Sequence, residues 1–151
     1  MPHINEKIDF TVEVFVVFNK RVLLRKHDKY KKWLGVGGHI ELNEDPIQAA
    51  LREVKEEVGL DIELIGKVLP FQRENYKELL PPKFLNRHKI NETHEHISLV
   101  YFAKSKTNTL QLSDKEVSED CRWFTKEEIE KSDEIVESIK KYALAALNEL
   151  G

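Results

Sequence analysis

Three glutamates whose spacing suits a bound cation lie close together in the chain, at Glu53, Glu56 and Glu57. In a helix, at about 100° per residue, their carboxylates share an arc of roughly 100°. Like charges three and four residues apart destabilise a helix, and the helix dipole disfavours negative charge near its C-terminus. A divalent cation would neutralise the cluster, and carboxylate oxygens suit Mg²⁺ or Mn²⁺. The alternative is a solvated acidic helix face.

Two neighbouring features bear on the same chemistry. Arg52 precedes Glu53 and lies one helical turn before Glu56. Its guanidinium can hold a carboxylate through two hydrogen bonds, although an ordinary surface pair with Glu56 is the alternative. Upstream, the pair Gly37–Gly38 permits left-handed conformations and a close approach of the backbone to a phosphate or metal. A glycine pair alone usually marks only a turn.

The element that carries the acids is a helix expected from about residue 46 to residue 58. Asp45 and Gln48 form a capping box at its start, and Pro46 suits the first helical position. Gly59 permits a left-handed end, and Asn43 tolerates the same conformation in the preceding loop. The apolar residues at helical spacing, expected to face the core, are Ile47, Leu51, Val54 and Val58.

Strands are expected on both sides of this helix. Their composition and turn signals place them at residues 10–18, 21–26, 61–69, 96–103 and 121–124. The first two form a hairpin with a two-residue turn at Asn19 and Lys20. Residues 70–95 carry three prolines and are interpreted as a long excursion. The basic segment 27–32 is expected to be a loop.

A second helical region ends the chain. Thr125 and Glu128 form another capping box, and Ser132 can cap a final helix. The apolar face of that helix comprises Ile135, Val136, Ile139, Tyr142, Ala143, Ala146 and Leu147. Strands on both sides of a helix, followed by helices, predict an α/β domain of the mixed α+β kind.

Length and composition restrict the class of protein. The chain has 151 residues, 40% hydrophobic and 34% charged, which indicates one globular domain. Its net charge of −3 and pI near 6.1 do not favour a general nucleic-acid binder. Cys121 is the single cysteine, so no intrachain disulfide is possible. Neither a signal peptide nor a membrane span is expected, and a cytoplasmic location fits.

The residues already described, taken in order, resemble the Nudix box. Gly38 is followed after five residues by Glu44, and after seven more by the run REVKEEVGL from Arg52 to Leu60. The box spans residues 38–60, and the resemblance extends over roughly residues 10 to 130. Two positions depart from the usual pattern: Val36 replaces a frequent proline, and Asn43 a frequent glycine. A single Nudix hydrolase domain over residues 1–151 is therefore expected.

The resemblance implies a mixed sheet held between helices and a MutT-like hydrolase that cleaves diphosphate linkages with Mg²⁺ or Mn²⁺. Glu53, Glu56 and Glu57 would bind the cation or position the attacking water. Arg52 would orient these acids with help from Glu44. A backbone carbonyl of Gly37 or Gly38 would complete the metal shell. Glu92 or Glu95 is a candidate for one further metal ligand outside the box.

The substrate is expected to be a small nucleotide-like diphosphate, and nucleoside triphosphates are the first candidates. The residues expected to contact it are Arg25, Lys26, Trp33, Gly38 and His39. For the basic residues of this region, which include Lys29, Lys31 and Lys32, solvation is the alternative, and for Trp33 it is core packing. For His94 and His96 a surface or substrate-contacting role is expected, because two alternating histidines are only a weak signal for zinc. Long nucleic acids and membranes are not expected as partners, and a homodimer is permitted.

Two other functions fit a Nudix fold. An inactive ligand-binding or regulatory module is the first alternative, but such modules usually have a damaged box, and this box is intact. An isopentenyl diphosphate isomerase is the second. It would need a suitably placed cysteine, whereas Cys121 lies far downstream of the box.

Overall fold

The computed structural model describes residues 7–27, 32–112 and 120–151. One mixed sheet contains β1 (Ile8–Phe18), β2 (Arg21–His27), β3 (Lys32–Leu34), β4 (Val36–His39), β5 (Ile62–Leu64), β8 (Phe84–Asn91), β9 (His94–Ser105) and β10 (Asp120–Phe124). Its helices are α1 (Pro46–Val58), α2 (Lys126–Lys131) and α3 (Glu137–Leu150). A separate small hairpin joins β6 (Gln72–Arg73) to β7 (Tyr76–Lys77).

β1 is the central strand, because the sheet runs in the order β10-β2-β1-β9-β5. It runs parallel to β9 and antiparallel to β2 and β4, which makes the sheet mixed. The hairpin turn between β1 and β2 is confirmed. Asn19 and Lys20 both have positive φ, at 49° and 64°, as a tight two-residue turn between twisted strands requires.

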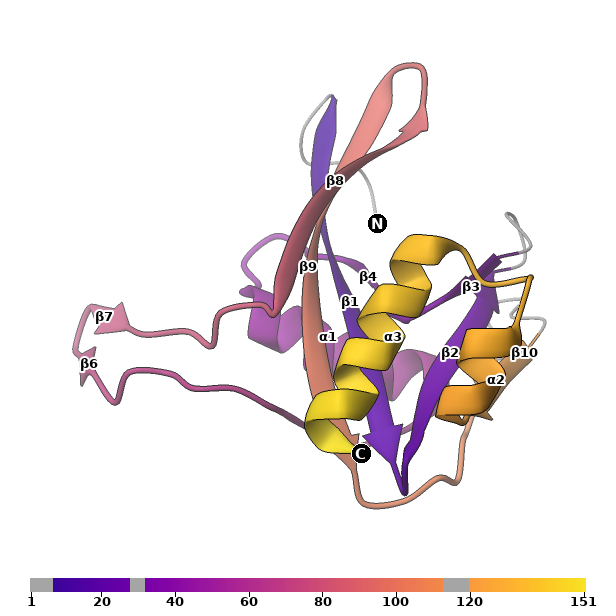
Figure 1. Ribbon diagram of the computed structural model, residues 1–151. Helices are drawn as coiled ribbons and strands as arrows, with labels where there is room; N and C mark the ends of the chain where they lie inside the picture. The colour runs from indigo at the N-terminus through magenta and orange to yellow at the C-terminus, as the bar shows by residue number, and fades with distance from the viewer. Residues whose placement is uncertain (1–6, 28–31, 113–119) are drawn as a thin grey trace.

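Helices cover both faces of the sheet, as expected. Side chains alternate along β1, so Val12, Val14 and Val16 join the core beneath α1. Phe15 and Val17 point the other way, into the core beneath α3. In Figure 1, α3 lies in front of the sheet and α1 behind it. None of the described helices is long and apolar enough to span a membrane.

Both capping boxes and both ends of α1 are confirmed, but three expectations about helices are wrong. Ser132 ends α2 instead of starting the final helix, and its hydroxyl accepts the N–H of Glu134 at 3.1 Å. α3 begins only at Glu137, so Ile135 and Val136 precede it. Leu51 is 42% exposed rather than buried. The buried side of α1 instead includes Ala49, Ala50 and Glu57, because the helix turns its acidic edge toward the sheet.

The strand expected at 61–69 and the excursion expected at 70–95 also need correction. β5 ends at Leu64, and β8 forms inside the supposed excursion. Both strands pair antiparallel with the same edge of β9. Residues 66–82 therefore form an insertion, here called the arm, which extends away from the body in Figure 1. It leaves the sheet at Gly66, whose φ of 155° favours glycine.

Candidate active site

Arg52, in the middle of α1, binds groups in the loop before the helix, on β4 and on the helix itself. Its Nε and Nη2 donate to the two oxygens of Glu44 at 2.7 and 3.0 Å, a two-bond contact. Nη1 donates to Glu53 at 2.9 Å and to Glu56 at 3.3 Å. Nη2 also donates to the carbonyl of His39 at 3.0 Å. Arg52 therefore fixes two acids of the cluster against the loop and against β4.

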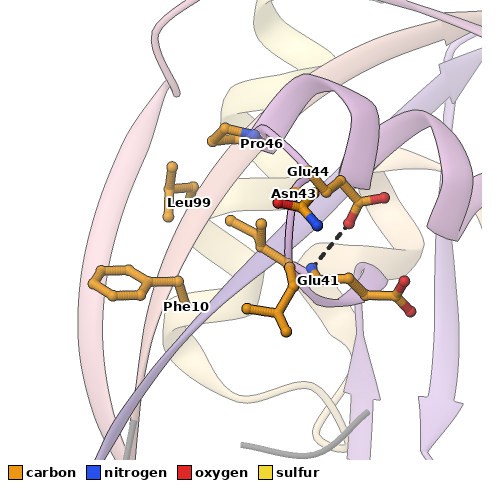
Figure 2. A pocket seen from close by; sticks show the side chains of 8 residues that line it. Phe10, Glu41, Asn43, Glu44, Pro46 and Leu99 are labelled. Carbon is orange, nitrogen blue, oxygen red and sulfur yellow. Dashed lines mark hydrogen bonds between the residues drawn. The ribbon is translucent and has the colours of Figure 1, made fainter. Parts of the chain in front are cut away.

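Glu44 holds the loop between β4 and α1. It accepts the backbone N–H of Glu41 at 3.0 Å, as Figure 2 shows. The Arg52 guanidinium keeps the pKa of Glu44 below its usual value. Asn43 adopts the expected left-handed conformation, with φ 64°. This loop also borders an open hollow of about 350 Å³, walled on its apolar side by Phe10, Ile40, Leu42, Pro46 and Leu99.

Glu53 lies against the Cα of Gly38. A Cβ on Gly38 would come within 2.6 Å of the Glu53 carboxylate, so only glycine leaves room for that carboxylate. Burial raises the pKa of Glu53, while Arg52 and a hydrogen bond with Glu57 oppose the rise. Glu53 and Glu57 therefore present adjoining carboxylates at the buried side of the helix.

Glu57 is buried and forms a salt bridge with Arg25, which projects from β2. Acids are tolerated near the C-terminal end of α1 because Arg25 supplies positive charge to Glu57 and Arg52 supplies it to Glu56. Glu56 differs from the other two acids, since its side chain is 59% exposed. The three acids thus offer oxygen donors that are buried to different extents. This set of donors suits a hard divalent cation.

The glycine pair does not lie in a flexible turn. Gly37 and Gly38 belong to β4, and the glycines with positive φ among the described residues are Gly59 and Gly66. The expected close approach is found, but to protein. A Cβ on Gly37 would lie 1.9 Å from the Val12 carbonyl oxygen. β4 can therefore lie close to both β1 and α1.

The remaining residues expected at the substrate site are placed unevenly. Lys26 is half-buried, with its Nζ 5.9 Å from the ring centroid of Trp33. Trp33 lies in the core, edge-on to Phe124 at 5.0 Å, which favours the packing alternative. His39 follows Gly38 on β4 and points to the opposite face of the strand. Lys29 and Lys31 lie outside the described residues.

The two acids considered as outer metal ligands lie away from α1. Glu92 is exposed in the turn between β8 and β9. Glu95 accepts two hydrogen bonds from Arg87, at 3.0 and 2.9 Å. Glu95 pairs with Ile8 of β1, whereas Gly38 pairs with Val12 of the same strand. Ile8 and Val12 are four residues apart, which is about 13 Å along a strand.

Sequence reasoning missed two acids on β1. Asp9 and Glu13 are the charged residues of a largely apolar strand, and this charge was the available signal. Glu13 accepts the N–H of Gly35 at 2.9 Å, and burial raises its pKa to about 7. Asp9 contacts His39 and His94, and near them the pKa of His96 falls to about 4 because of burial and the neighbouring imidazoles.

Comparison with known proteins gives a consistent result. A family model described as the NUDIX domain matches residues 9–146. A crystal structure of a NUDIX-family hydrolase from Clostridium perfringens is 34% identical, with a TM-score of 0.84, over 95% of this chain and 98% of that one. An m7GpppN-mRNA hydrolase of Xenopus laevis is 34% identical over 58% of this chain. A probable DHNTP pyrophosphohydrolase of Lactococcus lactis is 28% identical over 74% of it. The matches span only 35% and 63% of these two relatives.

Proposed function

The chain belongs to the Nudix family, and from this premise we propose that it is a divalent-metal-dependent hydrolase of a diphosphate linkage. The proposed substrate is a nucleoside triphosphate or a related nucleoside diphosphate derivative. The observation that carries the proposal is the hydrogen bond between Glu53 and Glu57, with Glu53 held against Gly38 by Arg52. Catalytic roles follow for Arg52, Glu53, Glu56 and Glu57.

In this proposal Glu53, Glu56 and Glu57 hold Mg²⁺ or Mn²⁺, together with a carbonyl of Gly37 or Gly38. A cation bound there would offset the phosphate charge and lower the pKa of a water molecule. Glu53 accepts the proton of the attacking water or positions a metal-bound hydroxide, and its place against Gly38 at the buried side of α1 supports this role. Arg52 keeps Glu53 oriented through the 2.9 Å hydrogen bond.

Substrate contacts are proposed on the side of β2 and β4. Arg25 already lies beside Glu57, so the positive charge of Arg25 would be close to a phosphate bound near the acids. Lys26, expected to share this role, lies beside Trp33 in the core beneath α3, so it points to the other face of β2 from Arg25 and is not part of the proposed phosphate site. The backbone of Gly38 lies beside Glu53, and the carbonyl of His39 accepts a hydrogen bond from Arg52. The relatives named as an mRNA hydrolase and a DHNTP pyrophosphohydrolase support a substrate with linked phosphates.

The experiment is a panel of nucleotides assayed for release of phosphate and pyrophosphate with Mg²⁺ or Mn²⁺, and with chelator. The panel includes nucleoside triphosphates with normal and oxidised purines, nucleotide sugars, ADP-ribose, dinucleoside polyphosphates and capped RNA. We expect metal-dependent turnover on one class. The inactive-module alternative predicts binding without turnover on any of them. The intact acidic cluster favours the hydrolase.

Matched variants test the residue roles on the preferred substrate. We expect Glu53→Gln and Glu57→Gln to fold, because glutamine keeps the shape and one acceptor oxygen, but to lose on the order of 100-fold or more in kcat. Glu63→Gln is the control, since Glu63 is exposed on β5. Circular dichroism and thermal unfolding check the fold of each variant. Wild-type turnover in either active-site variant would remove the assignment.

A further inference from the structure

A second cluster of metal-ligating side chains lies on the other face of the sheet from Glu53. Gly38 faces Glu53, so the next residue of β4, His39, points away from α1. There it meets Asp9 from β1 and two histidines from β9, His94 and His96. The sequence separates these residues widely, and the pairing of β1 with β4 and β9 brings them together.

The four side chains converge on one point. Each offers one ligand atom, and these atoms all lie within 4.8 Å of one another. Asp9 Oδ2 is 3.1 Å from His94 Nε2 and 3.7 Å from His39 Nε2. The His96 ring stands almost perpendicular to the rings of His39 and His94, with centroids 4.9 and 5.2 Å away.

Burial makes this convergence more than a chance surface grouping. Asp9 is 2% exposed and His94 7%, while His39 and His96 are half-buried. Gathering three imidazoles and a carboxylate out of water is costly, and the contacts of Asp9 with His94 and His39 offset part of that cost. A dication that accepts their lone pairs satisfies all four at once. The hydrolytic proposal uses none of these four side chains, since His39 takes part in it only through its backbone.

We propose that Asp9, His39, His94 and His96 bind a transition-metal ion of the Zn²⁺ type. Three imidazole nitrogens and one carboxylate oxygen form a donor set that suits a tetrahedral ion of this type, and not Mg²⁺. Zn–N bonds of about 2.0–2.1 Å place tetrahedral ligands about 3.4 Å apart. Small rotations of the side chains would close the present spread of 4.8 Å to that value.

The bound ion would link three strands next to the acidic site. It would join β1, β4 and β9, and the backbone carbonyl of the β4 ligand His39 already accepts a hydrogen bond from Arg52. The ion would therefore stabilise the folded chain, because a ligand that binds only the folded state raises its stability. It would act as a structural site, separate from the Mg²⁺ site of the proposed hydrolysis.

The experiment titrates chelator-treated protein, carrying no histidine tag, with Zn²⁺ by calorimetry and with Co²⁺ by visible absorption, in excess Mg²⁺. We expect about one ion per chain, the d–d bands of four-coordinate Co²⁺ and a rise in the melting temperature. His96→Ala and Asp9→Asn should each weaken binding at least about 10-fold. His96 is only half-buried, so its variant should fold even if a more disruptive change does not.

His88→Ala is the matched control. His88 lies 5.7 Å from His96, ring to ring, but is not one of the four converging residues. Its removal should change the affinity less than about threefold. Glu53→Gln should bind Zn²⁺ like the wild type, so failure of the hydrolytic proposal leaves this one standing. Two results would overturn the proposal: absence of stoichiometric Zn²⁺ binding, or unchanged affinity in both His96→Ala and Asp9→Asn. Either result would mean that the cluster is only an Asp9–His94 ion pair.

Discussion

At the scale of single residues, the acids of α1 are not equivalent. Glu57 is buried against Arg25, Glu53 lies between Arg52 and Gly38, and Glu56 is largely exposed. A charge argument from sequence treats them as one cluster that lacks positive charge. The structure shows that two arginines already supply part of that charge, so a cation would join the Arg25 and Arg52 pairs and not act alone.

Glu13 provides a prediction about stability and pH. Burial raises its pKa from 4.5 to about 7, against the opposing hydrogen bond from Gly35. A carboxyl whose pKa is higher in the folded state binds its proton more tightly there. Its contribution to the free energy of unfolding therefore falls as the pH rises from about 4.5 to about 7, and stays low above that.

We expect Glu13→Gln to remove this dependence, because glutamine carries no charge and can still accept the Gly35 N–H. Urea denaturation should show the variant more stable than the wild type by about 1–3 kcal/mol at pH 8, with little difference at pH 4.5. Glu63→Gln, exposed on β5, should show no such difference. An equal effect of Glu13→Gln at both pH values would contradict the assignment.

At the scale of elements, β4 positions the site from both sides. Gly37 lets it lie close to the backbone of β1, and Gly38 leaves room for the Glu53 carboxylate on α1. The carbonyl of His39, the last residue of β4, accepts from Arg52. The two neighbouring glycines thus have separate structural roles, one in sheet packing and one in the placement of an acid.

These roles predict different outcomes for the same substitution. In Gly37→Ala the added Cβ would meet the Val12 carbonyl at 1.9 Å, so the strands must separate. We expect a loss of about 1–3 kcal/mol or more in the free energy of unfolding. In Gly38→Ala the clash is with a movable side chain, so stability should change less and kcat should fall strongly. Denaturation and turnover measurements on both variants test this pattern, and the opposite pattern would refute it.

At the scale of the whole molecule, the arm is a self-contained insertion. The backbone N–H of Ile65 donates to the carbonyl of Phe102 at 2.8 Å, and the backbone N–H of Lys83 donates to the carbonyl of Val100 at 2.7 Å. These acceptors are two residues apart on β9, about 7 Å in a strand. The arm therefore leaves and rejoins the sheet at nearly the same place. Its apolar side chains include Val68, Leu69, Phe71, Tyr76 and Leu79, all exposed.

We expect the domain to fold without the arm. Replacing residues 68–79 by four glycine and serine residues keeps Leu80, which packs against the core beneath α1. The melting temperature should stay within a few degrees of the wild type, because a shorter loop costs little entropy to close. A decrease of more than about 10 °C in the melting temperature would show that the arm supports the fold.

The homodimer stays a prediction. Light scattering on the wild type and on the arm deletion would test it.

The sequence by itself determined the elements with strong local signals. The capping box of α1, its left-handed end at Gly59, the tight turn at Asn19 and Lys20 and the acidic cluster all depend on neighbouring residues, so local chemistry decides them. The family follows from the same short stretch. The tertiary structure decided what depends on distant residues. It set the orientation of α1 that buries Glu57 against Arg25 and the pairing of β8 with β9. It also brought Asp9 together with three histidines. Strand register sets these contacts, and no local pattern encodes which strands become neighbours.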